Sequence, residues 1–377
     1  MNKEEYWFWL CSIKGLFQPD IKKMLDEFGT PEEIWQAKEG EIRKRVKLSQ
    51  RQYEALEQSR DKDTFMSELE RLKRNNINFI YIESPSFPNA LRFLEDCPYC
   101  LYVKGNLPDP EVPSVGMVGA RACSVYGKEQ AENIAGRLAL AGIQIISGMA
   151  LGIDSYSAKA AINAGGKTFA ILGGGVDVIY PRENIELYYE IITSGGGIIS
   201  EYPMGAAPLG WQFPHRNRLI CAFSDWLAVI EAAKRSGTLT TASHALDQGM
   251  DIYALPGRIT DPVSCGCNRL IADGAGIILS AESFAEELSG TCRWKKWKEQ
   301  YQKSAGPEQI NQKIEKIAGE LSENAKLIHK NLGSDCVSTD ELSLNLKLSA
   351  SAVCEAVSEL ELEGFITRIN SNLVVRK

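Results

Sequence analysis

The segment FPHRNRLICAFSDWLAVIEAAKRSGTLTTA, residues 213–242, decides the fold class because it holds an apolar strand, a small-residue turn and the start of a helix. Its apolar run, 226–231, is short and rich in branched and aromatic residues, which is typical of a buried strand. The turn Ser-Gly-Thr at 236–238 opens a helix-length segment, 239–248. A strand followed by such a turn and a helix is part of a βαβ unit, so the segment predicts a parallel sheet.

The same pattern recurs from about residue 110 to residue 285. The other apolar runs lie at 115–118, 143–147, 168–172, 197–200, 251–255 and 276–279, and helix-length segments lie at 127–141, 153–164 and 184–193. Right-handed crossovers place the helices of such units on both faces of the sheet. We therefore predict an α/β fold with a parallel-sheet core over 76–290, to which 79–82 and 101–104 add strands at the entrance.

Helical periodicity dominates residues 1–75. Thr30, followed by Pro31 and two acidic residues, predicts a helix start, and Gly15 and Gly29 separate short helices. We expect a small all-α domain that resembles helix-hairpin-helix or SAM-like modules. A plain packing or interaction module is the alternative.

The last part of the chain, 309–377, follows a linker expected at 291–308. Thr339 and Ser349 are placed to N-cap two helices, and the segment 365–375 alternates like a β-hairpin. The order helix, helix, hairpin predicts a winged-helix domain.

The composition is that of an acidic globular protein of 377 residues, 44% hydrophobic and 24% charged. The net charge is −7, and residues 76–290 alone carry 14 Lys or Arg against 22 Asp or Glu, a balance of −8. Binding of a polyanion by this region therefore requires a focal site rather than a broad basic face. No apolar run reaches the roughly 18 residues of a membrane span, and no secretory signal is readable, so we expect a cytoplasmic protein without a membrane segment.

The 10 cysteines are scattered, and only Cys97 with Cys100 and Cys265 with Cys267 form close pairs. A zinc site built from both pairs is the less favoured alternative, since structural zinc usually takes two regularly spaced pairs. We expect reduced cysteines that serve as small apolar residues.

Small-residue turns follow five of the predicted strands. They read GAR at 119–121, SGMALGID at 147–154, LGGGVD at 172–177, SEYP at 200–203 and SGT at 236–238. The carboxyl ends of parallel strands meet at one edge, where glycine lets backbone N–H groups approach an anion and a helix N-terminus adds positive potential. The turns therefore predict a phosphate-binding edge. Lys234 and Arg235 either extend this edge or form an ordinary solvated pair.

Arg121, directly after the first turn, suits bidentate contact with a phosphate. The alternative is a structural salt bridge to Asp154 or Asp177. Phe213 and Trp211 offer rings on which bases stack, but for Trp211 we favour the alternative that it is buried in the core.

Arg216 and Arg218 allow two interpretations. On a strand they share a face, and on a helix they diverge, in which case one of them pairs with Glu231 or Glu201. Asn217, between them, either reads a base edge or caps a turn.

Residue sets for catalysis are poor. No Ser-His-Asp or Cys-His arrangement is readable around the three histidines, and the GxGxxG and P-loop motifs are absent. Asp154, Asp177 and Glu201 are an alternative set of metal ligands, which turn capping and salt bridges explain equally well. We therefore predict no catalytic residue, no cofactor and no metal.

The motifs as a set resemble the DprA/Smf family. They are GAR at 119–121, SGMALGID at 147–154, LGGGVDVIYP at 172–181, SEYP at 200–203, FPHRNRLI at 213–220 and EAAKRSGTLTTA at 231–242. The match covers about 110–285 in order, and the flanking helical and winged-helix segments agree in pattern. The resemblance implies an extended Rossmann-like core in a homodimer that binds and protects single-stranded DNA in natural transformation and loads RecA recombinase onto it.

The resemblance also assigns Arg121, the turn 147–154 and the segment 216–218 to DNA contact. Two positions depart from the family, because Ala120 replaces a frequent serine and Gly210 begins a stretch where some members carry a basic residue. With the turns included, the predicted DNA-binding residues are Gly119, Arg121, Ser147, Gly148, Gly173, Gly174, Arg216, Asn217, Arg218, Lys234, Ser236, Gly237 and Thr238.

Two alternative functions stay open. LOG-type phosphoribohydrolases have a similar core with the motif PGGxGTxxE, but here no Gly-Gly precedes 236–238 and Thr241 stands at the position of the catalytic glutamate, which disfavours hydrolysis. The other alternative is a nucleotide sensor whose winged helix binds duplex DNA. The expected recognition helix, 349–363, carries Glu but no Lys or Arg, which disfavours a major-groove contact and favours a protein partner.

Overall fold

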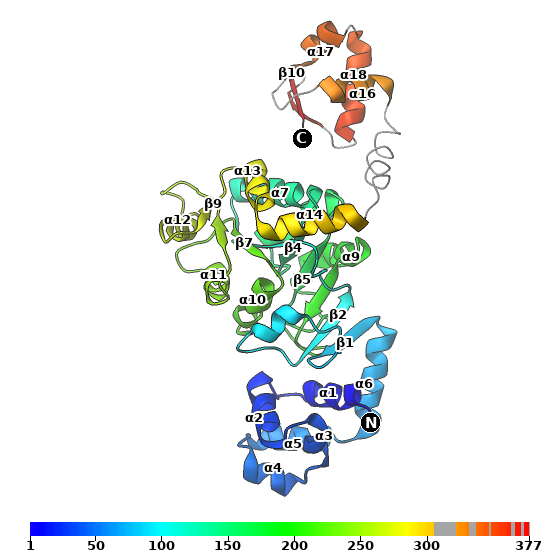
Figure 1. Cartoon of the computed structure of the whole chain (residues 1–377), viewed down its shortest axis with the longest axis vertical. Coiled ribbons are helices and arrows are strands. Elements are labelled where there is room, and N and C mark those ends of the chain that lie inside the picture. Colours follow the sequence, from blue (N-terminus) through cyan, green and yellow to red (C-terminus); the bar gives the residue numbers. More distant parts are fainter. Residues whose placement is uncertain (305–321, 332–336, 347, 363–365, 371–372, 377) are drawn as a thin grey trace. The chain divides into compact units, whose positions relative to one another are not determined.

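The structure is a computed structural model that describes residues 1–304, 322–331, 337–346, 348–362, 366–370 and 373–376 (Figure 1). It contains two compact units, Met1–Trp297 and Lys298–Lys377. None of the helices in these described ranges is long and apolar enough to cross a membrane.

A nine-stranded sheet forms the centre of the first unit, in the order β1-β2-β6-β5-β4-β3-β7-β8-β9. The strands are β1 (Ile77–Tyr81), β2 (Cys100–Gly105), β3 (Ser114–Val118), β4 (Gln144–Ser147), β5 (Thr168–Ile171), β6 (Gly197–Ser200), β7 (Trp226–Val229), β8 (Ile252–Ala254) and β9 (Gly276–Ile277). The strands from β3 to β9 pair in parallel, whereas β2 is antiparallel to both β6 and β1. The predicted parallel core and its two entrance strands are confirmed.

Helices cover both faces of this sheet. One face packs against α7 (Val125–Leu140), α8 (Ile153–Asn163), α13 (Ala281–Ser289) and the start of α14 (Cys292–Ser304). The other face packs against α10 (Gln212–Ala222), α11 (Gly237–Asp247) and α12 (Cys265–Ala272), and α9 (Ile185–Thr193) precedes β6. Successive side chains of β3 point to opposite faces of the sheet. Met117 packs in the cluster with α7 and α8, whereas Val118 packs in the cluster with α10 and α11.

Six helices precede the sheet, as predicted for an all-α segment. They are α1 (Lys3–Ser12), α2 (Gln18–Phe28), α3 (Pro31–Gln36), α4 (Glu39–Arg45), α5 (Gln50–Gln58) and α6 (Lys62–Arg74), and we call them the helical module. Thr30 caps α3 in a capping box with Glu33, and Gly29 ends α2 with φ of 84°, a conformation that glycine tolerates. Trp7 of α1 and Ile198 of β6 belong to one buried cluster, so the helical module packs directly on the sheet.

The expected linker at 291–308 needs a correction over its first part, which forms most of α14. Trp294 is buried in the cluster that covers one face of the sheet, and Arg293 forms an ion pair with Asp225 at 2.9 Å. These contacts hold the start of α14 on the first unit. Residues 305–308 lie outside the described residues.

The second unit has the predicted winged-helix order. It comprises α16 (Glu323–Asn331), β10 (Val337–Ser338), α17 (Thr339–Leu346), α18 (Ala350–Leu362), β11 (Ile366–Asn370) and β12 (Leu373–Arg376), with the sheet order β10-β12-β11. Ser349 caps α18 as predicted, since its hydroxyl accepts the N–H of Ala352. The cap of α17 is Ser338 and not Thr339, because Ser338 accepts the N–H of Glu341 and Thr339 is already helical.

Candidate nucleic-acid interface

The turns after β3, β4, β5 and β7 lie along one edge of the sheet, which we call the turn edge. The order of strands reverses at β3, because β4 lies on one side of it and β7 on the other. Such a reversal opens a crevice at the strand ends, where open α/β sheets bind ligands. Helix α10 crosses this edge, since Phe213 lies against Gly173 and Arg216 lies against Gly148.

Arg216 is an internal support of the turn edge. It is only 4% exposed, and its guanidinium donates to the carbonyl of Gly148 at 3.0 Å and to the side-chain oxygen of Asn217 at 3.2 Å. Nearby, the carboxylate of Asp154 accepts the N–H groups of Gly148 and Ala150. Burial lowers the pKa of Arg216 to about 10, although attraction to Asp154 opposes the shift. The guanidinium is therefore charged at neutral pH and adds positive potential to the edge.

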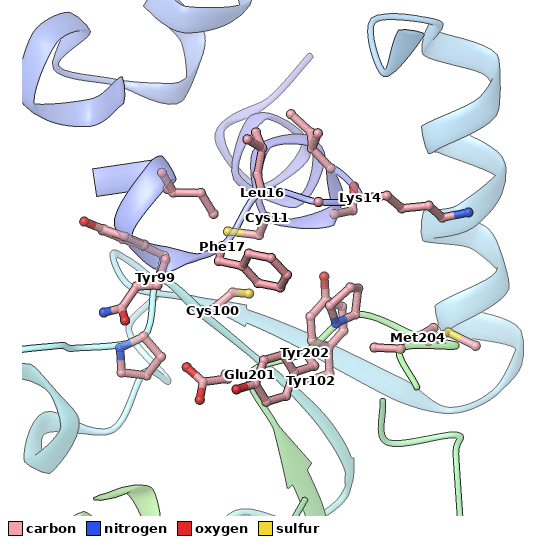
Figure 2. A pocket seen from close by; sticks show the side chains of 18 of the residues that line it. Cys11, Lys14, Leu16, Phe17, Tyr99, Cys100, Tyr102, Glu201, Tyr202 and Met204 are labelled. Carbon is pink, nitrogen blue, oxygen red and sulfur yellow. The ribbon is translucent and has the colours of Figure 1, made fainter. Parts of the chain in front are cut away.

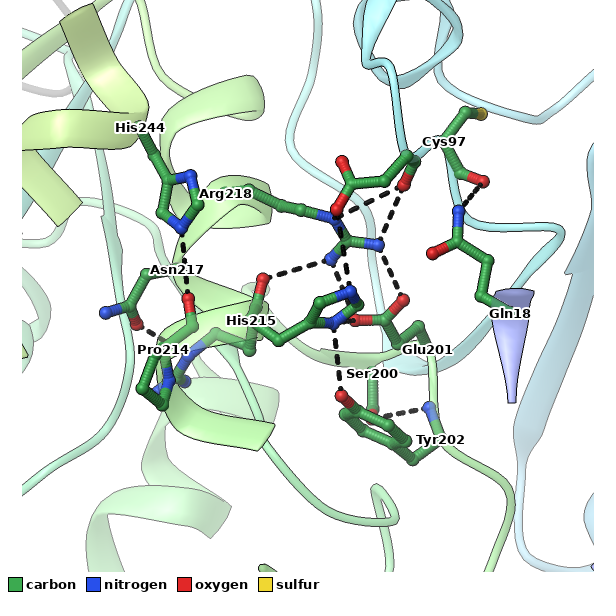
Figure 3. A network of polar contacts seen from close by, with 12 residues as sticks. Gln18, Cys97, Ser200, Glu201, Tyr202, Pro214, His215, Asn217, Arg218 and His244 are labelled. Carbon is green, nitrogen blue, oxygen red and sulfur yellow. Dashed lines mark hydrogen bonds and ion pairs between the residues drawn. The ribbon is translucent and has the colours of Figure 1, made fainter. Parts of the chain in front are cut away.

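Arg218 has a different role, because α10 is a helix and residues two apart on it point to different sides. It is 2% exposed and forms ion pairs with Glu201 at 2.8 Å and with Asp96 at 2.7 Å (Figure 3). Burial disfavours the charge on Glu201, but Arg218 and His215 outweigh burial and lower the pKa of Glu201 to about 2. The predicted pairing of one arginine with Glu201 is confirmed, and this guanidinium is bound to the protein's own carboxylates.

Arg121 is the exposed basic residue of the first turn. Its guanidinium carbon lies 5.3 Å from the ring centroid of Phe213, a cation–π contact, and that ring lies 5.6 Å from the ring of Tyr180. Asp154 and Asp177 bind other groups in the described part of the chain, so neither alternative salt bridge forms. A guanidinium without a carboxylate partner among the described residues thus stands over Phe213, whose ring in turn contacts Tyr180.

The turn 236–238 begins α11 with open backbone. Gly237 is exposed with free space at its α-carbon, whereas Thr238 is buried. No side chain caps the helix, and the hydroxyl oxygen of Ser236 is buried without a hydrogen-bond partner among the described residues. Unsatisfied N–H groups at a helix start attract anions, and Lys234 is exposed beside them. This arrangement suits a phosphate group.

Several predicted contact residues of the first three turns serve the fold itself. A side chain at Gly119 would meet Ile153 at 2.5 Å, and one at Gly174 would meet the backbone of the loop after β6 at 3.0 Å. The hydroxyl of Ser147 donates to a backbone carbonyl of β3 at 2.9 Å. These residues set the shape of the edge through close packing and internal hydrogen bonds.

Glu231 does not pair with either arginine of α10. Its carboxylate accepts the N–H of Ser124 at 2.9 Å and the hydroxyl of Ser124 at 2.5 Å, at the start of α7. A helix N-terminus stabilises a buried carboxylate, and Glu231 is 1% exposed. In the described ranges no three His, Cys, Asp or Glu residues lie together as metal ligands.

Comparison with known proteins shows which family the chain belongs to. The family model of DNA recombination-mediator protein A matches residues 78–289, and the DprA winged helix domain matches residues 315–370. The chain belongs to the DprA/Smf family. The resemblance found in the sequence motifs is confirmed.

Named relatives cover most of the chain. Protein Smf of Escherichia coli K12 is 35% identical over 298 residues, which are 78% of this chain and 77% of that protein. The X-ray structure of DNA processing protein A from Streptococcus pneumoniae has a TM-score of 0.65 at 32% identity and covers 76% of this chain and 99% of that one. DNA processing protein A from Helicobacter pylori, described for its single-stranded DNA binding mode, has a TM-score of 0.50 at 29% identity over 56% of this chain and 95% of its own.

One expectation about the DprA/Smf motifs is wrong, because Trp211 is 48% exposed instead of buried in the core. Trp211 directly precedes α10, and its ring meets Phe17 of the helical module edge to face at 5.1 Å. Sequence analysis also missed Tyr180 and Asp96. The signal for Tyr180 was its place directly after the third turn, whereas nothing in the local sequence marks Asp96 as a partner of Arg218.

Proposed function

We propose that this protein binds single-stranded DNA along the turn edge. The observation that carries the proposal is the exposed guanidinium of Arg121, which lies over Phe213 at 5.3 Å without a carboxylate partner in the described residues. A phosphate binds such a guanidinium while a base stacks on the neighbouring rings. The single-stranded DNA binding mode described for the Helicobacter pylori relative supports the same ligand class.

The predicted site residues, together with Phe213 and Tyr180, take three roles in this proposal. The single-stranded DNA contacts Arg121, Phe213, Tyr180 and the turn from Lys234 to Gly237. Arg216 and Asn217 support the edge from inside, and Arg218 positions α10 without touching DNA. The residues that shape the edge through their backbone or packing are Gly119, Ser147, Gly148, Gly173, Gly174 and Thr238.

We further propose that the protein protects the bound strand in natural transformation and passes it to RecA recombinase as a homodimer. Membership of the DNA recombination-mediator family supports this role. Mixing the protein with RecA and single-stranded DNA should speed the formation of RecA filaments. No acceleration at any protein ratio would contradict the loading role while leaving DNA binding intact.

We propose a binding role without catalysis. Glu231, the buried carboxylate that precedes the 236–238 turn, is already bound to Ser124. Incubation with nucleoside monophosphates should therefore release no free base. Release that disappears in Glu231→Gln would favour the phosphoribohydrolase alternative instead.

The decisive experiment compares single-stranded and double-stranded oligonucleotides by filter binding across a range of salt concentrations. Arg121→Ala should weaken single-strand binding for all base sequences and make the slope of log K against log salt shallower by about 0.7, the value for one phosphate contact. Arg137→Ala is the matched control, because it removes an exposed arginine from α7. Equal affinity of Arg121→Ala and the control would remove Arg121 from the site.

A further inference from the structure

A pocket of about 660 Å³ lies between the helical module and the sheet (Figure 2). Its walls come from the connection between α1 and α2, the start of β2, the segment after β6 and the start of α10; they include Phe17, Tyr99, Tyr102, Glu201, Trp211 and His215. We call it the junction pocket. Small-molecule sites in proteins have volumes of about 300–1,000 Å³ and combine apolar walls with a few polar groups.

One polar group in the junction pocket has no strong partner among the described residues. Tyr102 is 1% exposed, and its hydroxyl forms no hydrogen bond of normal geometry with the described residues. The polar groups around it are the thiols of Cys11 and Cys100 and the carboxylate of Glu68, and its contact is with Cys100, whose sulfur is a weak acceptor. Buried hydroxyl groups in proteins are nearly always paired, so this one indicates a ligand with a hydrogen-bonding edge.

Two aromatic side chains at the mouth of the junction pocket are half exposed. Phe17 is 42% exposed and Trp211 is 48% exposed, and their rings meet at 5.1 Å. Large apolar rings on a surface mark binding sites when they cluster at a concave face. Aromatic rings of this kind stack on nucleobases with little preference for sequence.

We infer that the junction pocket binds a nucleobase that stacks on Trp211 and shares a hydrogen bond with Tyr102. The inference rests on the proposed function, because α10 reaches both sites. Phe213 lies at the turn edge, and Trp211, two residues earlier, lines the pocket. A single DNA strand that passes over the start of α10 brings a base to the mouth of the pocket. A free nucleotide is the other source of a base that could bind there.

The first experiment locates the base by fluorescence. Oligonucleotides carry 2-aminopurine at one position each, because stacking on an indole quenches this base. The full chain should quench one position most strongly, and Trp211→Ala should abolish that quenching, whereas Trp211→Phe should keep most of the affinity. Phe93→Ala is the control, since Phe93 is 89% exposed outside the pocket.

The second experiment replaces the quenched nucleotide by an abasic one. In the wild-type protein the loss of the base should weaken binding by about 5- to 150-fold, which is the range for one base stacked on an aromatic ring. In the Trp211→Ala variant, the same abasic replacement should change the binding affinity little. Tyr102→Phe keeps the ring and should lower the affinity for the oligonucleotide about 2- to 10-fold, which is the effect of one hydrogen bond.

The source of the base is decided by adding 2-aminopurine nucleoside without DNA. Saturable quenching that needs Trp211, with no such quenching in oligonucleotides, identifies a free nucleotide as the ligand. If neither the nucleoside nor any oligonucleotide position depends on Trp211, the inference is overturned. Oligonucleotide binding that still depends on Arg121 would then keep the proposed function, so the two failures are distinguishable.

Discussion

Single residues at the turn edge act according to their partners rather than their type. Arg216 and Arg218 are both buried arginines of α10, yet one donates to the backbone of the second turn and the other pairs with Glu201 and Asp96. Arg121 has neither kind of partner and lies over Phe213 instead. Of these three arginines, only Arg121 presents an exposed guanidinium that a ligand can contact directly.

A substitution at Phe213 distinguishes the contribution of base stacking to DNA affinity from that of phosphate attraction. Phe213→Leu keeps an apolar side chain but removes the ring, so single-strand binding should lose about 1–3 kcal/mol. The slope of affinity against salt should stay as in the wild type, because no charge is removed. Titrations of a fluorescent oligonucleotide at several salt concentrations measure both quantities; a changed slope would contradict the assignment of Phe213 to stacking.

At the scale of elements, one buried ion pair holds α10 against two segments of the sheet. Glu201 directly follows β6 and Asp96 precedes β2, and both bind the guanidinium of Arg218 (Figure 3). His215 adds a contact to Glu201 at 3.2 Å. The position of α10 determines where Phe213 and Arg216 meet the turns, so this pair positions the site without contacting a ligand.

Glu201→Gln leaves Arg218 without its most buried partner and should cost about 3–5 kcal/mol of unfolding free energy. The pKa of Glu201 is lowered from 4.5 to about 2, so its contribution is present above pH 4.5 and is lost as the pH falls towards 2. Urea unfolding at a series of pH values should show the wild-type advantage shrinking across this window. Asp273→Asn, in an exposed pair with Arg269, is the control and should show only a small difference in unfolding free energy. An advantage that is constant from neutral pH down to pH 2 would contradict the lowered pKa.

At the scale of the whole molecule, the helical module and the sheet form one folding unit. Trp7, Trp9 and Leu72 share a buried cluster with strand residues such as Ile198. Trp294 closes the opposite side of the same unit. A boundary near residue 76 therefore cuts through a core, although the composition and the periodicity both change there.

Fragments test this division. A fragment of residues 1–297 should fold and bind single-stranded DNA within a few-fold of the full chain, because the turn edge lies inside it. A fragment of residues 76–290 should unfold at a lower temperature or aggregate, since it exposes the apolar surface that the helical module and Trp294 cover. Thermal unfolding by circular dichroism and filter binding measure both effects. A stable 76–290 fragment with full affinity would show that the shared cluster is dispensable.

The local sequence was sufficient for the strands of the sheet and for the family, but not for α14, which was predicted to be a linker. Alternation of apolar runs with helix-length segments predicted all seven parallel strands, because periods of two and 3.6 residues reflect contacts within an element. The Gly-rich turns and the FPHRNR segment placed the candidate site at the strand ends, because parallel strands bring their carboxyl ends to one edge whatever their order. Thr30, Pro31 and the two acidic residues after them predicted a helix start for the same local reason, and the structure shows a capping box there.

Tertiary structure alone decided how the side chains of the site are used. Arg218 meets Asp96 across 122 residues of sequence, and Trp211 meets Phe17 from another element, so no local pattern records either contact. The exposure of Trp211, the weakly paired hydroxyl of Tyr102 and the junction pocket depend on how the helical module packs on the sheet. Sequence periodicity tells which face of an element is apolar, but the partner of that face is chosen by packing among segments distant along the chain.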